Sequence, residues 1–358
     1  MSRTPSMPRV AQVLAGANQG GAENFFVRLV NGLQASGEVD QKAFIRGHEH
    51  RMDALRQGGV PVEGFRFGGP FNQMDRLRYR SALREFHPDI VMTWMNRATL
   101  LTPPGDYTLI SRLGHYYNLK YYRHADYWIG ISHGICDHLV KGGMPAEKVF
   151  YIPNFADETP VEALPRDSFN TPSDRPLILA AGRLHVNKGF DILLQALKDV
   201  PDAILWLAGA GPEERALKQQ CSELGLDERV RFLGWRNDVT RLMKTADLFV
   251  CPSRHEGLGS IVMESWAHQC PIIATDSQGP GELIDSGQTG IVTPVDEVAP
   301  LADAIRQLLD DPSLREQLTE NAEKHYWTHF SREVVVDQYL KLFATIRTPK
   351  PDATISSR

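Results

Sequence analysis

The sequence predicts an α/β protein built from two doubly wound domains, and three observations support this fold class. The chain has 358 residues, a length typical of about two domains. Short, nearly continuous apolar runs alternate with segments of helical periodicity, as in parallel sheets that helices cover on both faces. Residues 153–176 turn to Pro, Asp, Ser and Thr without periodicity, which indicates a linker between two cores.

The second half of the chain shows this alternation most clearly. We expect strands at 177–182, 203–211, 230–235, 248–253, 271–276 and 290–294. Helices are expected at 190–200, 212–224, 237–246, 260–269 and 301–311, with a turn at 279–284. The pattern is that of a parallel sheet with crossover helices.

The first half repeats the theme less regularly. Strands are expected at 9–14, 42–47, 89–94, 107–112, 126–132 and 148–153, and a helix at 22–33 follows a glycine loop. The last strong helical pattern covers residues 331–346. We therefore expect domains at 1–160 and 161–330.

Composition and charge exclude several classes of protein. With 42% hydrophobic and 23% charged residues, the chain is neither disordered nor fibrous. It shows no signal-peptide core and no run near 18 apolar residues, so we expect a cytoplasmic protein. Residues 1–155 hold 18 Lys and Arg against 13 Asp and Glu, whereas the rest holds 21 against 31. The acidic total argues against nucleic-acid binding, but the basic first half leaves room for an anionic partner.

Polar residues directly after strands are candidates for a ligand site, because ligands of parallel sheets bind beyond the carboxyl ends of the strands. Arg183 and Lys188 follow the expected strand at 177–182, beside a glycine turn and a helix start. Two fixed cations there suit a diphosphate. The alternative is a solvated basic loop, and spacing alone favours neither.

The segment HEGLGSIVMES places two acids eight positions apart. Gly257 and Gly259 permit close approach of the backbone to a ligand, and a helix is expected to begin near Ser260. Glu264 then lies about one turn into the helix, on the same side as Ser260. A carboxylate there can accept hydrogen bonds from the paired hydroxyls of a ribose or a sugar. In the alternative, Glu264 faces water and Glu256 caps a loop.

Further motifs along the chain narrow the function: GGAE at 20–23, IPNF at 152–155, GRLHVNKG at 182–189, LAGAGPE at 207–213, VRFLGW at 230–235, and the E-x7-E pair Glu256/Glu264. In this order they resemble those of the GT-B glycosyltransferases of family 4, and the resemblance covers most of the chain. It implies two Rossmann-like domains facing each other across a cleft, with a C-terminal helix at about 331–348 returning to the first. It also implies retaining transfer of a hexose from a UDP- or GDP-sugar to an acceptor held by the first domain.

The resemblance also assigns roles to residues. Arg183 and Lys188 would hold the donor diphosphate, Glu264 the ribose, and Glu256 the transferred sugar. Gly20 and Gly21 would approach the donor phosphates from the opposite wall. The other expected donor contacts are Gly182, Arg236, Gly257, Leu258, Gly259 and Ser260. No D-x-D stretch is present, so we expect no metal and no cofactor, with Arg and Lys replacing a divalent ion.

Three residues beyond strands of the first domain are candidates for the acceptor side. His115 follows the strand at 107–112, where some members of the family place a histidine near the sugar, and it is a candidate catalytic residue. Its surroundings, RLGHYY, depart from the common pattern, and packing in a Tyr-rich loop is the alternative. Asn96 and Arg97, after the strand at 89–94, are candidate acceptor or phosphate contacts.

A further helical segment carries a basic ridge beside an apolar one: Arg76, Arg80 and Arg84, and Tyr79, Leu83 and Phe86. Such a surface can dock on the anionic inner face of the cytoplasmic membrane, although a solvated face is the alternative. Together with the basic first half, it favours a cell-envelope glycan or glycolipid acceptor such as a lipopolysaccharide core. The rival functions are a GT-B sugar-nucleotide 2-epimerase, which needs no acceptor, and a non-catalytic GT-B subunit, which would have a broken donor site.

Overall fold

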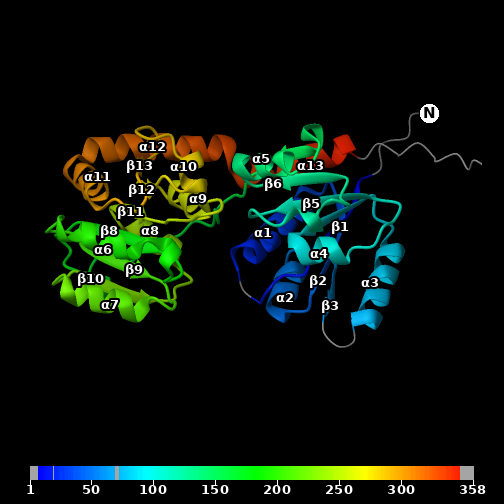
Figure 1. The fold of residues 1–358 in the computed structure, drawn as a ribbon, viewed down its shortest axis with the longest axis horizontal. Coiled ribbons are helices and arrows are strands. Elements are labelled where there is room, and N and C mark those ends of the chain that lie inside the picture. The colour runs from blue at the N-terminus through cyan, green and yellow to red at the C-terminus, as the bar shows by residue number, and fades with distance from the viewer. Residues whose placement is uncertain (1–6, 19, 69–71, 347–358) are drawn as a thin grey trace, which may run out of the picture. The chain divides into compact units, whose positions relative to one another are not determined.

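The computed structural model describes residues 7–18, 20–68 and 72–346, and it contains two compact α/β units (Figure 1). The first unit is Met1–Asn154 with Arg332–Arg358, and the second is Phe155–Ser331. The division lies a few residues before the expected boundary between 160 and 161. The C-terminal helix α13 (Arg332–Ile346) belongs to the first unit, so the chain returns to this unit after the second.

The first unit is built on a seven-stranded parallel sheet with the order β3-β2-β1-β4-β5-β6-β7. The strands are β1 (Arg9–Leu14), β2 (Asp40–Arg46), β3 (Val62–Phe65), β4 (Ile90–Trp94), β5 (Thr108–Leu113), β6 (Tyr127–Gly130) and β7 (Val149–Tyr151). All of β4 is buried, as expected of a strand covered on both faces. The sequence prediction missed β3, because Glu63 and Gly64 interrupt its apolar character.

The helices of the first unit are α1 (Gly21–Ser36), α2 (Glu49–Gln57), α3 (Asn72–Phe86), α4 (Met95–Leu101), α5 (His133–Lys141) and α13. Helix α13 packs on α1, and the approach is close at Gly32, where a Cβ atom would lie 3.0 Å from the Val336 side chain. The Arg112 Nε–H at the end of β5 donates to the hydroxyl oxygen of Tyr339 on α13, at 2.8 Å. Helix α13 therefore completes the core of the first unit.

The second unit is built on a six-stranded parallel sheet with the order β10-β9-β8-β11-β12-β13. Its strands are β8 (Leu177–Ala181), β9 (Ile204–Ala208), β10 (Val230–Gly234), β11 (Leu248–Cys251), β12 (Ile272–Thr275) and β13 (Ile291–Thr293). In each sheet the first strand lies between two neighbours, where the strand order reverses. This reversal makes both sheets doubly wound, and ligands of such sheets bind beside it.

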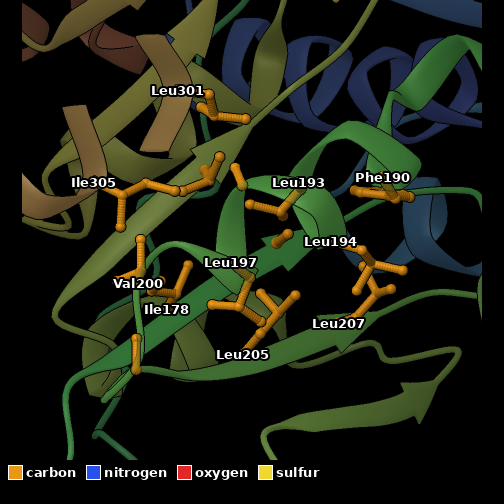
Figure 2. Packing of buried hydrophobic residues seen from close by; sticks show 14 of the residues in the cluster. Ile178, Phe190, Leu193, Leu194, Leu197, Val200, Leu205, Leu207, Leu301 and Ile305 are labelled. Carbon is orange, nitrogen blue, oxygen red and sulfur yellow. The ribbon is translucent and has the colours of Figure 1, made fainter. Parts of the chain in front are cut away.

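Helices α6 (Phe190–Lys198), α7 (Glu214–Glu223), α8 (Val239–Thr245), α9 (Ser260–Ala267), α10 (Gln278–Leu283), α11 (Val298–Asp310) and α12 (Pro312–His329) complete the second unit. Figure 2 shows its core, in which Leu193 and Leu197 of α6 and Ile305 of α11 join Ile178 and Leu205 of the sheet. All five side chains are almost completely buried. The core holds the strands rigidly, so the loops at their carboxyl ends have fixed origins.

The prediction of a turn at 279–284 is wrong, because residues 279–283 lie in the short helix α10. Two glycines and a proline gave it the composition of a turn. Pro280 lies in the first turn of the helix, where a missing N–H breaks no hydrogen bond within the helix. Helix α12 was also missed, since its apolar residues form no continuous stripe.

All four cysteines are free thiols. Cys221, Cys251 and Cys270 are buried, as expected of core residues, whereas Cys136 is partly exposed. Within the described residues no group of three His, Cys, Asp or Glu could hold a metal ion. Nor does any helix in the described part of the chain have the length and apolar character to cross a bilayer.

Candidate functional site

The loop after β8 carries Arg183 and Lys188, and the end of β9 fixes where it starts. The Gly182 N–H donates to the Ala208 oxygen at 2.9 Å. A Cβ atom on Gly209 would lie 1.8 Å from the Gly182 oxygen, so only glycine fits there. The turn at residues 208–211 thus lets the ends of β8 and β9 pack closely, and it sets the direction of the loop that carries Arg183 and Lys188.

Lys188 is paired with Glu256, although their loops follow different strands, β8 and β11. The Lys188 Nζ donates to the Glu256 Oε2 atom, and the side chains are 25% and 20% exposed. The Ser253 hydroxyl donates to the same oxygen at 3.4 Å. Burial lowers the pKa of Lys188, but the adjacent Glu256 carboxylate outweighs burial and raises this pKa above its ordinary 10.5. Lys188 is therefore a cation at neutral pH, held in one orientation.

Arg254 joins the two loops, and the sequence analysis missed it. Its guanidinium donates to both carboxylate oxygens of Asp191 at 2.9 and 2.7 Å and to Asp296 at 2.5 Å. The same group donates to the Val186 carbonyl at 2.6 Å, and the Arg254 N–H donates to the Asn187 oxygen at 2.8 Å. These bonds fix the turn that ends in Lys188. An arginine in a polar loop has no periodicity that could have revealed this role.

Helix α9 begins at Ser260, as predicted, and Glu264 lies one turn into it. Gly259 has a φ of +72°, in the left-handed region, and it redirects the chain from loop to helix. The Gly279 N–H of α10 donates to the backbone carbonyl oxygen of Glu256 at 2.9 Å, which ties the loop to the neighbouring helix. Glu256, the first amides of α9 and the half-buried Glu264 therefore follow β11 at the carboxyl edge of the sheet.

The remaining predicted donor residues differ in how available they are. Arg183 is exposed and makes no hydrogen bond or ion pair within the described chain. Arg236 is paired with Asp238 through bonds of 2.8 and 2.6 Å and lies over the Phe169 ring at 5.2 Å. Hydrogen bonding from Arg236 lowers the pKa of Asp238. Leu258 is 4% exposed, so only its backbone could touch a ligand. Arg183 is thus free to bind an anion, whereas Arg236 is largely neutralised.

In the first unit, Gly20 directly precedes α1 and Gly21 is its first residue. The structure shows that a side chain at Gly20 would collide with a neighbour. A Cβ atom on Gly20 would lie 2.2 Å from the Glu23 carboxylate, and one on Gly16 would lie 2.6 Å from it. Glu23 is buried, and it accepts the Ala17 N–H at 2.8 Å. Gly21 faces open space. Gly20 therefore makes room for a buried acid, while Gly21 remains open to a ligand.

Arg51 on α2 holds the same glycine loop, and the sequence gave no sign of it. The Arg51 side chain is buried and donates to the Ala17 and Asn18 oxygens at 2.8 and 3.1 Å. Burial lowers the pKa of Arg51, and the charge of Glu23 partly opposes this effect. Glu23 and Arg51 together fix the path of the loop after β1.

The three predicted acceptor residues follow neighbouring strands. Asn96 and Arg97 are exposed in the first turn of α4, after β4. His115 follows β5 and is exposed. The centroid of its ring lies 6.1 Å from that of Tyr116 and 5.8 Å from that of Tyr117. Since β4 and β5 pair in parallel, all three lie at the same edge of the first sheet as the glycine loop.

Comparisons with known proteins agree with this arrangement. The model of Glycosyltransferase Family 4 matches residues 19–159, and that of Glycosyl transferases group 1 matches residues 163–325. The lipopolysaccharide core biosynthesis glycosyltransferases LpsE and LpsD of Rhizobium meliloti (strain 1021) are 36% identical over 330 residues and 37% identical over 329 residues. Each alignment covers 91% of this chain, with 96% of LpsE and 95% of LpsD.

Solved structures share the fold. The crystal structure of Anabaena HepE in complex with UDP-glucose has a TM-score of 0.80 and 21% sequence identity. The match covers 94% of this chain and 100% of the other. With two matched family models and relatives aligned along nearly the whole chain, the protein belongs to the family 4 glycosyltransferases and has their GT-B fold.

Proposed function

We propose that this glycosyltransferase moves a hexose from a nucleoside diphosphate sugar to a cell-envelope saccharide, with a lipopolysaccharide core as the favoured acceptor. The names of the two Rhizobium relatives support the acceptor, and the UDP-glucose complex of a protein with this fold supports the donor. The observation that carries the donor site is the Lys188–Glu256 pair, fixed by Arg254 between two strand ends.

Each donor-site group has a role in this proposal. An ammonium has three N–H donors, and Glu256 uses one of those on Lys188, which leaves others for the diphosphate. Arg183 adds a second cation, and the first amides of α9 add donors that favour an anion. These groups stabilise the charge that grows on the leaving diphosphate. Glu256 also accepts from a sugar hydroxyl, and Glu264 accepts from the ribose.

The transfer itself retains the configuration at the anomeric carbon in this proposal. The bond from the anomeric carbon to the diphosphate oxygen breaks, and a bond to the acceptor oxygen forms on the same face. The acceptor proton passes to an oxygen of the leaving phosphate. Because the acceptor oxygen attacks the anomeric carbon directly, no side chain acts as a nucleophile. His115, Asn96 and Arg97 lie at the edge of the first unit and would orient the acceptor.

The test begins with the thermal shift of the purified chain in the presence of UDP, GDP, ADP and TDP. A ligand at 100 times its dissociation constant adds about 2.7 kcal/mol of stability. We expect one nucleotide alone to raise the melting temperature, after which its sugars are assayed for transfer to purified lipopolysaccharide cores. No shift with any nucleotide would favour the non-catalytic subunit. Consumption of UDP-GlcNAc without an acceptor would favour the epimerase.

We further propose that α3 touches an anionic membrane near the acceptor. The arginines of the basic ridge are exposed, but Tyr79 and Leu83 of the predicted apolar ridge are each 2% exposed and pack in the core. Met74 and Leu77, which are 72% and 65% exposed, are instead the apolar side chains available to a membrane. Each cation near such a surface contributes about 1 kcal/mol. The chain should sediment with vesicles that contain phosphatidylglycerol and not with pure phosphatidylcholine. Replacing the three arginines with glutamine should abolish this sedimentation, and equal sedimentation would contradict the proposal.

A further inference from the structure

The carboxyl ends of β2 and β3 border an open pocket that the proposed transfer does not use. Its volume is about 670 Å³, within the range of pockets that bind small ligands. It lies wholly within the first unit, and its walls include Arg46, His48, Glu49, Phe65, Arg66 and Arg78. The pocket therefore opens at the same sheet edge as the predicted acceptor residues.

Positive charge exceeds negative charge around this pocket. Arg46, Arg66 and Arg78 contribute three cations. The carboxylate of Asp75 is 8% exposed and is occupied by the backbone N–H groups of Arg66 and Phe67, at 3.1 and 2.8 Å. It therefore anchors the wall and offers little to a ligand.

The two other nearby carboxylates already have cationic partners. The Glu49 side chain is 77% exposed and lies 3.5 Å from Arg56. Glu63 is shared between Lys42 at 3.0 Å and Arg78 at 3.7 Å. Glu63 in turn offsets part of the charge of Arg78. The pocket is lined by three arginines and two acids, Glu49 and Asp75, so one positive charge is in surplus, which favours an anionic ligand.

Several of these groups are already positioned. The Arg78 guanidinium lies over the buried Phe65 ring at 4.6 Å and donates to the Gly64 carbonyl. Arg46 is half-buried, and its side chain makes no hydrogen bond or ion pair with the described part of the chain. Helix α2 begins at Glu49, so the backbone N–H groups of its first turn also lie beside the pocket. Burial is the main cause that lowers the pKa of His48, and the charges of Arg51 and Arg46 lower it further.

The sheet order places this pocket near the glycine loop of the first unit. Strands β3 and β2 precede β1 in the sheet, so the pocket lies one to two strand spacings, roughly 5–10 Å, from the glycine loop after β1. One or two sugar units span such a distance. We propose that the pocket binds a phosphate- or carboxylate-bearing sugar of the acceptor, so that the acceptor is an anionic saccharide. This inference rests on the proposed function, in which the first unit holds the acceptor.

Binding of small probes to the full chain tests the proposal without any turnover. Glucose 6-phosphate and trigalacturonate represent the two anionic groups, maltotriose is the neutral control, and inorganic phosphate tests for a simple anion site. We expect an anionic sugar to bind more tightly than maltotriose, and Arg46→Gln to weaken this binding about tenfold, the usual loss of one charge-assisted hydrogen bond. Arg123→Gln is the matched control, because Arg123 is exposed in the first unit and does not line the pocket.

The outcomes separate this inference from the proposed function. Tighter binding of glucose 6-phosphate alone indicates a phosphorylated sugar, and that of trigalacturonate alone indicates an acidic sugar. The inference fails if maltotriose or inorganic phosphate binds as tightly as the anionic sugars. It also fails if Arg46→Gln and Arg66→Gln both bind like the wild type. If the unmodified chain binds anionic sugars but no nucleotide, the donor assignment is overturned and this inference stands.

Discussion

The Lys188–Glu256 pair allows one substitution to be followed from structure to measurement. Lys188→Met keeps most of the apolar stem and removes the ammonium. The Glu256 side chain is 20% exposed. Without the ammonium, its carboxylate still accepts from the Ser253 hydroxyl at 3.4 Å but has lost its cation. Leaving a fully buried charge unpaired costs about 3–5 kcal/mol, and the residual exposure here reduces our expectation to about 2 kcal/mol. Glu256→Gln in the same chain should recover at least half of this loss.

Urea unfolding of the four chains of this double-mutant cycle measures the coupling. With a slope of about 2 kcal/mol per molar urea, Lys188→Met should lower the midpoint by about 1 M. The matched control is Lys218→Met, which removes an exposed pair with Glu214 at 2.7 Å and should cost less than about 1 kcal/mol. Strictly additive losses at Lys188 and Glu256 would show that the two side chains do not stabilise each other.

The same variants separate structure from catalysis. If Lys188 stabilises the leaving diphosphate, Lys188→Met should lower kcat by about 10²-fold, as the loss of one oxyanion donor does. Lys218→Met should keep its turnover. Wild-type turnover in Lys188→Met would rule out the diphosphate role even if the stability coupling were as large as expected.

Three further predictions concern the second unit. Glu264→Gln should weaken UDP binding about tenfold by loss of a bond to the ribose, and an unchanged dissociation constant by calorimetry would contradict that role. EDTA should leave transfer intact, and a loss of activity reversed by Mg²⁺ would contradict a metal-free site. Burial lowers the pKa of His268 below its ordinary 6.5, so the unfolded chain binds the proton first and stability should fall as the pH drops below 6.5. In thermal melts across this range His268→Gln should show a smaller fall, and equal slopes would contradict the assignment.

Sequence patterns predicted the parts of the fold whose cause is local. The strands of the second unit are continuous apolar runs, and the start of α9 follows from a glycine before Ser260. The residues after these strands could be named, because parallel sheets gather strand ends at one edge. Strand β3 escaped prediction because an acid and a glycine interrupt its apolar residues, and helix α10 because it contains two glycines and a proline.

The residues that position the site could not be predicted, because their causes are non-local. Arg254 matters through Asp191, which lies on a helix of another part of the second unit. Arg51 matters through the carbonyls of a loop that precedes α1. No pattern of neighbouring residues records such contacts. Motifs thus indicate where a ligand binds, while the groups that hold the motifs in place appear only in three dimensions.

The return of α13 to the first unit has a consequence for biosynthesis. Helix α13, which covers one face of α1, and its Tyr339, the partner of Arg112, arrive only after residues 155–331 have been translated. At about 5–20 residues per second, the first unit waits roughly 10–35 s on the ribosome with this face uncovered. The second unit, continuous in sequence, can finish folding earlier although it begins later. The half that is synthesised first is therefore the half that is completed last.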